Sequence, residues 1–429
     1  MRHRMTAIAV GAIAGVALVA GTASSAGRVP AGSASRSCAF ELRIGTVLPF
    51  TGDLAAYGAN LDRAVRLAVD LQNAALRRAG LDGQASVRLV ASEDGQTQAS
   101  ASVEAATKLV KSDKANVIIG EMASSATIPM AQSVTIPNKV VQISPTSSAP
   151  QISTIKDNGY LWRTYPSDAL QGKVLGQAAL QAFGKGATVN VGARNDAFGT
   201  ALKQLFVSQW KKLGGKIGVN IAWNPDQASF DTEAQKLVAG NPAGWVIIDF
   251  PDTFEKFLPS LVRTGKWEAR RTLVTEALRN SDVLSKLGDP VIGLRGTAAS
   301  AAGGPAGRAF ATLWKQKVRG AKPYTGFEGT AFDAAMVAFL AAVKACSSSP
   351  AKIKANLRAV SGPPGTKVTF KQLDKAVKLL LAGKDVDYEG AFSPVDFDRN
   401  GDIGSAVFEI WQYAGGATIK TLKTVTFRG

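Results

Sequence analysis

The chain has 429 residues, of which 46% are hydrophobic and 19% are charged. That composition excludes an intrinsically disordered chain, and the length allows two or three domains with their own cores. The formal net charge is +17, but lysine and arginine are scattered along the sequence rather than gathered into a basic arm or an aromatic–basic module. We therefore expect no nucleic-acid partner and assign the charge to a solvated surface.

The N-terminal residues have the pattern of a secretory signal peptide. Arg2 and Arg4 precede an apolar run, Ala7–Ala20, and small residues that include the cleavage-type sequence Ser24–Ala26 follow it. A basic start, a short apolar core and a small-residue end are the three regions of such a peptide. The apolar run is shorter than the roughly 20 residues that span a bilayer, and no later segment of the sequence reaches that length. We therefore expect residues 1–26 to be a signal peptide and the mature protein to be exported, extracytoplasmic and not embedded in a membrane.

The end of the apolar run is similar to a bacterial lipid-attachment motif but lacks its cysteine. Leu18–Thr22 has threonine where the lipidated cysteine would stand, and Cys38 lies too far beyond the apolar run to replace it. We therefore expect no lipid anchor, and we expect residues 27–40 to be a linker that leads into the folded part.

Cys38 and Cys346 are the two cysteines of the chain. Exported proteins fold in an oxidising compartment, where two thiols usually pair. Cys38 precedes the first predicted strand and Cys346 ends a long predicted helix, and such ends can share one rim of an α/β layer. A disulfide between them is therefore feasible, and two unpaired buried thiols are the alternative.

Short apolar runs alternate with amphipathic stretches in the part that follows the linker. Apolar residues at helical spacing predict helices, and the short apolar runs between them predict strands. An alternating strand–helix order predicts a parallel sheet with helices on both faces. The predicted strands are Leu42–Leu48, Val87–Ala91, Val117–Gly120 and Val140–Ser144, and the predicted helices are Tyr57–Ala79, Ala99–Lys111 and Thr127–Val134.

The same alternation restarts after Tyr160–Pro166, which predicts a second lobe of the same class. Its predicted helices are Asp168–Phe183, Thr200–Leu213, Phe230–Ala239 and Thr253–Thr264, and its predicted strands are Thr188–Ala193, Ile217–Trp223, Trp245–Phe250 and Thr272–Thr275. We therefore expect an α/β protein with two Rossmann-like lobes, each with a parallel central sheet, rather than one large sheet.

The last part of the chain is mainly helical and ends in two strands. Helices are predicted at Ala306–Val318, Gly329–Ala345, Ala351–Val360 and Lys371–Ala382, and strands at Ala406–Tyr413 and Thr418–Phe427. We expect these helices to cover the first lobe and the final strands to pair with the second. The chain then crosses between the lobes three times, which predicts a hinge. The expected lobes are residues 41–164 with 297–403, and residues 165–296 with 404–429.

Most of the usual catalytic machinery is missing from the sequence. The only histidine is His3, inside the predicted signal peptide, which excludes Ser-His-Asp and Cys-His catalysis and histidine-bearing zinc sites in the exported part. No GxSxG, P-loop or CxxC pattern occurs. Ser153–Lys156 and Ser349–Lys352 match the SxxK motif of penicillin-recognising serine enzymes, but this spacing of two common residues arises by chance in most long chains. We expect no enzyme, no catalytic residues and no cofactor.

One acidic stretch is similar to the start of a calcium loop. Asp396, Asp398, Asn400 and Gly401 follow the spacing of the first half of an EF-hand, but position twelve is Val407, where a glutamate is needed. We therefore expect a polar hairpin turn built on Asn-Gly, and no metal site.

Polar loops follow the strands predicted for the first lobe. In open α/β sheets, ligands bind beyond the carboxyl ends of the strands. Pro49–Asp53 with Tyr57-Gly58 follows the first strand, Glu121–Thr127 follows the third, and Ser144–Ser148 follows the fourth. Hydroxyl groups and free N–H groups at helix N-termini suit an anion such as a carboxylate. Helix capping by the same serines and threonines is the alternative.

The second lobe offers the opposite charge at its strand ends. Asp249 and Phe250 end one predicted strand, and Glu276 follows another. Carboxylates that face a cleft can hold an ammonium group. Phe198, in the loop after the first strand of this lobe, is expected either to cover the apolar part of a ligand or to pack the helix start.

These stretches, in this order and spacing, resemble the type I periplasmic binding proteins of the leucine/isoleucine/valine-binding family. The resemblance covers the chain from about residue 41 to its end. The stretches that carry it are Ile44–Asp53 with Tyr57-Gly58, Gly120–Ser125, Ile143–Ser148, Trp162–Thr164, Asp196–Gly199, Thr330–Ala335 and Phe397–Asp402. Each stretch alone is weak evidence for the family, but their shared order over nearly the whole mature chain makes the resemblance specific.

The resemblance implies roles for individual residues. Ser124 and the loop with Ser147 and Ser148 correspond to the positions that hold an amino acid's α-carboxylate. Glu276 corresponds to the carboxylate that meets the α-ammonium, and Tyr57 corresponds to a tyrosine that borders the ligand.

Two positions depart from the family's pattern. Phe198 stands where many relatives have tyrosine, so a phenolic hydrogen bond would be missing. The loop at Asp249 and Phe250, which in the family helps to set the preference for the ligand's side chain, aligns less closely. The exact ligand therefore stays open.

The resemblance implies an extracytoplasmic solute-binding protein of an ABC importer, which closes about a hinge on a small amino acid, branched-chain or similar. Its expected partners are that ligand and a membrane permease, and we expect a monomer. The same fold also serves binding proteins for amides, urea and aromatic acids, and it serves ligand sensors, so these are the alternatives.

Overall fold

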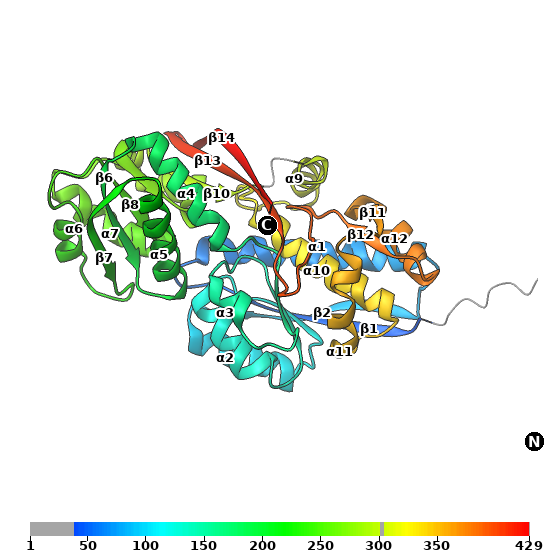
Figure 1. Ribbon diagram of the computed structural model, residues 1–429. Coiled ribbons are helices and arrows are strands. Elements are labelled where there is room, and N and C mark those ends of the chain that lie inside the picture. Colours follow the sequence, from blue (N-terminus) through cyan, green and yellow to red (C-terminus); the bar gives the residue numbers. More distant parts are fainter. Residues whose placement is uncertain (1–37, 301–303, 429) are drawn as a thin grey trace, which may run out of the picture. The chain divides into compact units, whose positions relative to one another are not determined.

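The structure, a computed structural model, describes residues 38–300 and 304–428. The predicted signal peptide and the threonine-containing motif before the linker lie outside this part. The strands of the described part form two main sheets with helices around them (Figure 1). This arrangement confirms the predicted α/β fold with two lobes.

The first sheet is parallel throughout and has the strand order β2-β1-β3-β4-β5. Its strands are β1 (Phe40–Leu48), β2 (Ala85–Asp94), β3 (Val117–Gly120), β4 (Val141–Ser144) and β5 (Leu161–Arg163). The helices of this lobe are α1 (Ala55–Arg78), α2 (Ala99–Lys111), α3 (Ser124–Met130), α9 (Pro305–Lys317), α10 (Phe327–Ala345), α11 (Pro350–Asn356) and α12 (Leu373–Leu381). Val117 and Ile119 of β3 belong to the core shared with α1 and α10, and Ile118 belongs to a separate core with α2 and α3. This alternation is the period of two expected of a strand buried on both faces.

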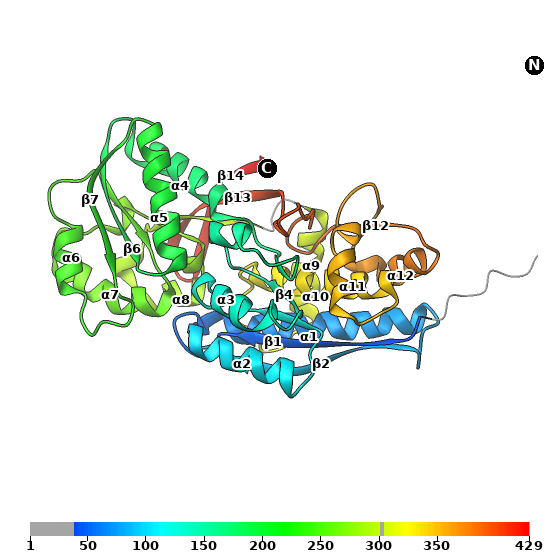
Figure 2. The same cartoon turned by 60° about the horizontal axis from the view of Figure 1, so that its bottom comes forward.

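The late helices return to the first lobe, as predicted. Both α10 and α12 contact α1, and α10 also contacts β1, β3 and β4. Figures 1 and 2 both show these yellow and orange helices beside the blue α1. Residues Phe327–Val343 of α10 are all buried, which matches a sequence that is apolar all round. In the described part no single helix is long and apolar enough to cross a bilayer, and α10 passes that test only together with α11, which it meets at 104°.

The second sheet has the strand order β14-β13-β10-β9-β8-β6-β7. Five neighbouring strands are parallel, and β13 runs antiparallel to both β10 and β14. The strands are β6 (Thr188–Arg194), β7 (Lys216–Trp223), β8 (Gly244–Ile248), β9 (Thr272–Val274), β10 (Arg295–Ala299), β13 (Ser405–Gly415) and β14 (Thr418–Arg428). The helices are α4 (Asp168–Phe183), α5 (Ala197–Lys212), α6 (Asp231–Leu237), α7 (Pro251–Arg263) and α8 (Ser281–Leu287). The final strands therefore pair with the second sheet, as predicted.

The chain crosses between the sheets three times in the described part. It leaves the first lobe between β5 and α4, returns between β10 and α9, and leaves again before β13. Strand β10 pairs with β13 as far as Ala299, so the return crossing lies after that residue, slightly beyond the boundary expected at residue 297. A small parallel pair, β11 (Thr366–Val368) with β12 (Val386–Tyr388), lies between α11 and the last crossing in sequence.

A disulfide joins Cys38 to Cys346, with the two Cα atoms 4.8 Å apart. It connects the residues just before β1 to the C-terminal end of α10. The two cysteines are 308 residues apart in sequence, so the bond joins the start of the first lobe to its late helices.

Candidate functional site

A small cavity lies between the two lobes. Its walls come from segments that follow three strands of each main sheet, namely β1, β3 and β4 in the first and β6, β8 and β9 in the second, and from the start of α10. The residues that line it are Leu54, Met122, Ala123, Ser124, Thr146, Ser148, Phe198, Phe250, Glu276, Ala277 and Phe327. The space that the centre of a water molecule can reach is about 20 Å³, about enough for one water. The two lobes are therefore closed on one another, and a ligand enters only when these walls separate.

Ser124 provides a hydrogen-bond donor on the first-lobe side, and Ser148 lines the cavity beside it. Ser124 Oγ accepts hydrogen bonds from the backbone nitrogens of Ser148 and Ala149, at 3.2 and 3.1 Å. Because these bonds use the oxygen's lone pairs, the hydroxyl hydrogen of Ser124 stays available to donate. Thr146 also lines the cavity, but its hydroxyl donates to the carbonyl of Met122 at 2.8 Å. The two loops are thus joined to each other and present a donor to the cavity.

Ser147 does not line the cavity, although the sequence predicted that it would. Its hydroxyl lies 2.7 Å from Thr127 Oγ1 and 3.1 Å from the carbonyl oxygen of Met122. Behind it, Ser144 donates to the carbonyl of Glu121 at 2.7 Å. These buried hydroxyls satisfy backbone carbonyls of the neighbouring loop, as buried polar groups must. We therefore assign Ser147 a supporting role behind the ligand loop.

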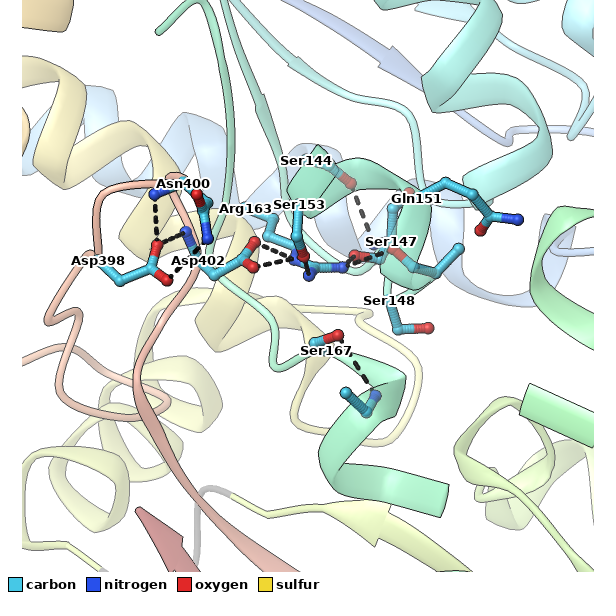
Figure 3. Close-up of polar contacts among 12 residues, drawn as sticks. Ser144, Ser147, Ser148, Gln151, Ser153, Arg163, Ser167, Asp398, Asn400 and Asp402 are labelled. Atoms are coloured by element: carbon cyan, nitrogen blue, oxygen red, sulfur yellow. Dashed lines mark hydrogen bonds and ion pairs between the residues drawn. The ribbon is translucent and has the colours of Figure 1, made fainter. Parts of the chain in front are cut away.

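Arg163, at the end of β5, attaches the loop Ser144–Ala149 to the last crossing between the lobes (Figure 3). Its guanidinium is fully buried and pairs with Asp402, with 2.7 Å between Nε and Oδ1. It also donates to Ser153 Oγ at 2.7 Å and to the carbonyl of Ala149 at 3.0 Å. A buried cation with a carboxylate and several acceptors is satisfied, so this cluster fixes the loop in place.

The stretch similar to a calcium loop is the expected polar turn. Asp398 Oδ1 accepts hydrogen bonds from the backbone nitrogens of Asn400 and Asp402, at 2.7 and 3.0 Å (Figure 3). Asp402 in turn forms an ion pair with Arg163, so the charge of this carboxylate is already balanced by a guanidinium. Among the described residues no group of three or more His, Cys, Asp and Glu side chains could hold a metal ion.

Neither SxxK pattern lies at the cavity. Ser153 is bonded to Asp402 and Arg163, and Lys156 is exposed. The other serine, Ser349, comes just before α11. A nucleophilic serine needs its lysine within hydrogen-bond reach, and no such bond occurs for Ser153 in the described part of the chain.

Tyr57 crosses from one lobe to the other beside the cavity. Its hydroxyl donates to the carbonyl of Ala277 at 2.7 Å, and its ring meets Phe327 edge-on at 5.2 Å. Burial raises the pKa of Tyr57, so the phenol stays a donor. The next residue, Gly58, allows the loop after β1 to pack on α1, because a Cβ there would lie 2.1 Å from the carbonyl oxygen of Pro49. The Tyr-Gly pair therefore places the phenol at the closing edge of the first lobe.

Phe198 and Phe250 form the apolar wall of the second lobe. Their rings stack with centroids 5.1 Å apart and an interplanar angle of 16°, and both line the cavity. Asp249 lies behind this wall, where its Oδ1 accepts from the backbone nitrogen of Phe250 at 2.9 Å. Burial raises the pKa of Asp249 well above its usual value, and the nearby Arg194 opposes that rise. Asp249 therefore supports the wall and does not line the cavity.

Glu276 is the carboxylate that lines the cavity from the second lobe. It is buried and accepts a hydrogen bond from Gln171 of α4. Burial raises the pKa of Glu276 to about 7, although the hydrogen bond from Gln171 opposes the rise. An ammonium group beside it would favour the charged form.

Asp168 is a second buried carboxylate that sequence reasoning missed. It is the first residue of α4 and is fully buried, and no ion pair with its carboxyl group occurs in the described part of the chain. Burial, and then the negative charge of Glu276, raise the pKa of Asp168 well above its usual value, although the hydroxyl of Ser148 and the charge of Arg163 oppose the rise. Its backbone nitrogen donates to the carbonyl of Ser148 at 2.8 Å, which places it directly beside the ligand loop. A buried carboxylate without an ion-pair partner is costly, so Asp168 marks a place where a cation would be stabilised.

The cavity therefore combines three chemical features. The hydroxyl groups of Ser124 and Ser148 suit an anionic group, and the carboxyl group of Glu276 suits an ammonium group. Leucine, methionine and phenylalanine side chains form the rest of the wall. This combination fits a small zwitterion with an apolar side chain.

The model of the periplasmic binding protein family matches residues 41–402 of this sequence. The chain belongs to this family. Membership implies an extracytoplasmic protein that binds a solute, and it confirms the resemblance predicted from the sequence. The described cavity lies within the matched residues.

Individual periplasmic binding proteins show how far the similarity extends. The chemotactic signal transduction system substrate-binding protein BasB of Halobacterium salinarum is 24% identical over 362 residues, which are 82% of this chain and 82% of that protein. The Leu/Ile/Val-binding protein BraC3 of Rhizobium johnstonii is 29% identical over 197 residues, 46% of this chain and 51% of that protein. The crystal structure of a leucine binding protein from Thermotoga maritima matches with a TM-score of 0.73 at 20% identity, covering 90% of this chain and 98% of that one. The structural match shows the shared two-lobed fold.

Proposed function

We propose that this periplasmic binding protein delivers a small amino acid with an apolar side chain, branched-chain or of similar size, to an ABC importer. The observation that carries the proposal is the pairing of donors on one lobe with buried carboxylates on the other. Ser124 and Ser148 would hold the α-carboxylate of the ligand, and Glu276, supported by Asp168, would hold its α-ammonium. The relative named as a Leu/Ile/Val-binding protein supports the choice of ligand class.

The proposed mechanism is closure about the three crossings between the lobes. The ligand would bind first to the serine loops of the first lobe. The second lobe would then bring Glu276, Phe198 and Phe250 against it, and Tyr57 would bond to Ala277 across the closing edge. Since these contacts form only in the closed state, the ligand stabilises that state by its differential affinity. A membrane permease would recognise the closed protein, which acts as a monomer and not as an enzyme.

The predicted export and the missing lipid anchor belong to the same proposal. The N-terminal pattern around Arg2 and Arg4 supports export, and Thr22 in place of cysteine supports the absence of lipid. Radiolabelled palmitate added to cells that express the protein should therefore leave it unlabelled. The secreted or envelope fraction should contain a chain shortened at Ser24–Ala26, which N-terminal sequencing would detect.

The test of the ligand is a thermal-shift screen of the mature protein. The panel contains the twenty amino acids, urea, short amides and benzoates. A ligand that binds only the folded state raises the melting temperature. We expect leucine, isoleucine, valine or another apolar zwitterion to raise it, and benzoate and urea to have no effect, because neither supplies an ammonium for Glu276. A shift from benzoates or amides alone would reject the amino-acid assignment.

A sensory role is a second candidate function. The relative from Halobacterium salinarum, matched over 82% of both chains, is named as a substrate-binding protein of a chemotactic signal transduction system. In that case the closed protein would contact a receptor instead of a permease. Uptake of the labelled ligand by cells that lack this protein decides between the two: lost uptake supports the importer, and normal uptake with lost chemotaxis supports the sensor.

A further inference from the structure

Arg194 lies where the second lobe meets the first, outside the cavity. It is the last residue of β6, and its guanidinium contacts three carboxylates. Two of them, Asp196 at 2.5 Å and Asp249 at 3.8 Å, belong to the same lobe. The third is Asp53, in the loop after β1 of the first lobe, with 2.7 Å between the guanidinium nitrogen and Oδ2. The Arg194–Asp53 ion pair therefore joins the two lobes directly.

This ion pair is buried, in contrast to an ordinary surface pair. The Arg194 side chain is 4% exposed and that of Asp53 is 12% exposed. Asp53 also accepts a hydrogen bond from the hydroxyl of Thr253 at 3.3 Å, and its carbonyl accepts from the backbone nitrogen of Asp252 at 3.4 Å. Water and salt screen such a pair less than an exposed one.

Arg194 loses one of its three carboxylate contacts when the lobes open and keeps the other two. When the lobes separate, Arg194 keeps Asp196 and Asp249, which lie on its own lobe. The carboxylate of Asp53 loses Arg194 and Thr253, and it returns to water on the first lobe. The contact with Asp53 therefore contributes free energy to the closed form alone, and this is the condition for shifting the closure equilibrium.

The same arginine is in direct contact with the apolar wall of the cavity. Its Cζ lies 3.8 Å from the centroid of the Phe250 ring, and Phe250 stacks on Phe198. Both rings line the cavity, and so does Leu54, the neighbour of Asp53 in sequence. The position of the guanidinium relative to Asp53 is therefore tied to the gap between Leu54 and the phenylalanine pair.

We propose that the Arg194–Asp53 ion pair limits the size of the ligand's side chain. A side chain that fits between Leu54 and the two phenylalanines leaves the ion pair intact. A larger one holds Phe250 away from the first lobe, and because Arg194 lies on Phe250, the contact with Asp53 lengthens and its contribution is lost. Arg194 and Asp53 are in this sense positioning residues, since neither lines the cavity. The size limit rests on the proposed amino-acid function, whereas the ion pair's effect on closure does not.

The test uses the mature protein with Asp53→Asn, which keeps the shape of the side chain and removes its charge. Arg194 then retains its two other carboxylates, so the second lobe keeps its fold. The matched control is Asp231→Asn, which breaks the exposed ion pair with Arg263 inside the second lobe, where both side chains are 60% exposed. Equal melting temperatures of the ligand-free variants would show that neither change acts through folding.

The first readout is the distance between the lobes without ligand. Nitroxide labels are attached to cysteines at the exposed positions 112 and 212, at the ends of α2 and α5, because both native cysteines are held in the disulfide. Electron spin resonance should show a larger open fraction for Asp53→Asn than for wild type, and no change for Asp231→Asn. The same distance distribution in Asp53→Asn and wild type would overturn the role of the ion pair in closure.

The second readout is the ratio of affinities for valine and phenylalanine. Wild type should prefer valine, and Asp53→Asn should reduce this preference about tenfold. In wild type only the valine complex keeps the ion pair, so the substitution weakens valine binding and leaves phenylalanine binding unchanged. An unchanged ratio would overturn the size limit. If no amino acid of the thermal-shift panel binds wild type, the amino-acid function and the size limit both fail, and the ligand-free distances alone decide whether the ion pair favours closure.

Discussion

At the level of single residues, we expect the buried carboxyl group of Glu276 to couple amino-acid binding, as proposed above, to proton release. In the ligand-free protein the pKa of Glu276 is raised to about 7, so at pH 6 most molecules carry the proton. A bound ammonium favours the carboxylate and lowers that pKa, so the complex holds fewer protons than the free protein. We therefore expect the affinity for a zwitterionic amino acid to increase as pH rises from about 5 to 7, by at most about tenfold per pH unit, and to level off above.

Isothermal titration in buffers of different ionisation enthalpy measures both the affinity and the number of protons released. Glu276→Gln is the control variant, because it keeps the side chain's size and its contact with Gln171 but cannot ionise. It should bind more weakly and lose most of the pH dependence, and Asp168 would account for any part that remains. Equal affinity of wild type and Glu276→Gln at pH 8 would reject the assigned role.

The side chains at the cavity show what sequence reasoning can and cannot reach. Ser124, Ser148 and Glu276 were predicted because they follow strands whose carboxyl ends meet at one edge, and that rule depends on order alone. Ser147 was predicted by the same rule, yet its side chain points to the neighbouring loop, because adjacent residues in an extended loop face different ways. Asp168 was missed because an aspartate at the N-terminus of a helix is usually explained by its favourable interaction with the helix dipole.

At the level of secondary structure, long and strongly patterned elements were predicted well. The predicted bounds of α2, β3 and α4 are those of the structure, and α1 and α10 differ by two residues or fewer at each end. The strands that were missed are short: β5, β11 and β12 have three residues each, and β10 has five, namely Arg, Gly, Thr and two Ala. Such strands lack an apolar run, and only pairing with neighbours makes them strands.

The disulfide is an element-level feature with a testable consequence. It closes a loop of 308 residues, so it restricts the unfolded chain strongly. Changing both cysteines to serine should lower the stability by about 2–5 kcal/mol, measured by urea denaturation. Ligand affinity should stay unchanged, because the bond lies before the start of β1 and the cavity lies beyond its end, a nine-residue strand away. A weaker affinity at unchanged stability would contradict this separation.

At the level of the whole molecule, function depends on a balance between open and closed forms. In the structure the lobes contact one another through the Tyr57–Ala277 hydrogen bond, the Arg194–Asp53 ion pair and the walls of the cavity. Two of these contacts need no ligand, so we expect the protein to close without one, and the proposed ligand would add contacts to Glu276 and Ser124. The free energy of binding then has two parts: the direct contacts of the ligand, and the free-energy difference between the open and closed forms without ligand. Changes outside the cavity can therefore alter affinity as strongly as changes within it.

The buried carboxyl groups also set how the whole protein's stability depends on pH. Burial raises the pKa of Glu121 to about 8 and those of Glu276 and Asp333 to about 7, while in an unfolded chain such groups ionise near pH 4. Between about pH 4 and 8 the folded protein therefore binds more protons than the unfolded chain, so its free energy of unfolding falls as pH rises.

We expect the melting temperature of the ligand-free protein, measured by calorimetry at constant ionic strength, to be higher at pH 5 than at pH 8. A saturating amino acid should make this decline shallower, because it ionises Glu276 in the folded state and removes that group's excess proton. Glu276→Gln should show the shallower decline without ligand, and ligand should not alter it further. A melting temperature that rises from pH 5 to pH 8 would mean that burial does not hold these carboxyl groups in the protonated form in the folded protein.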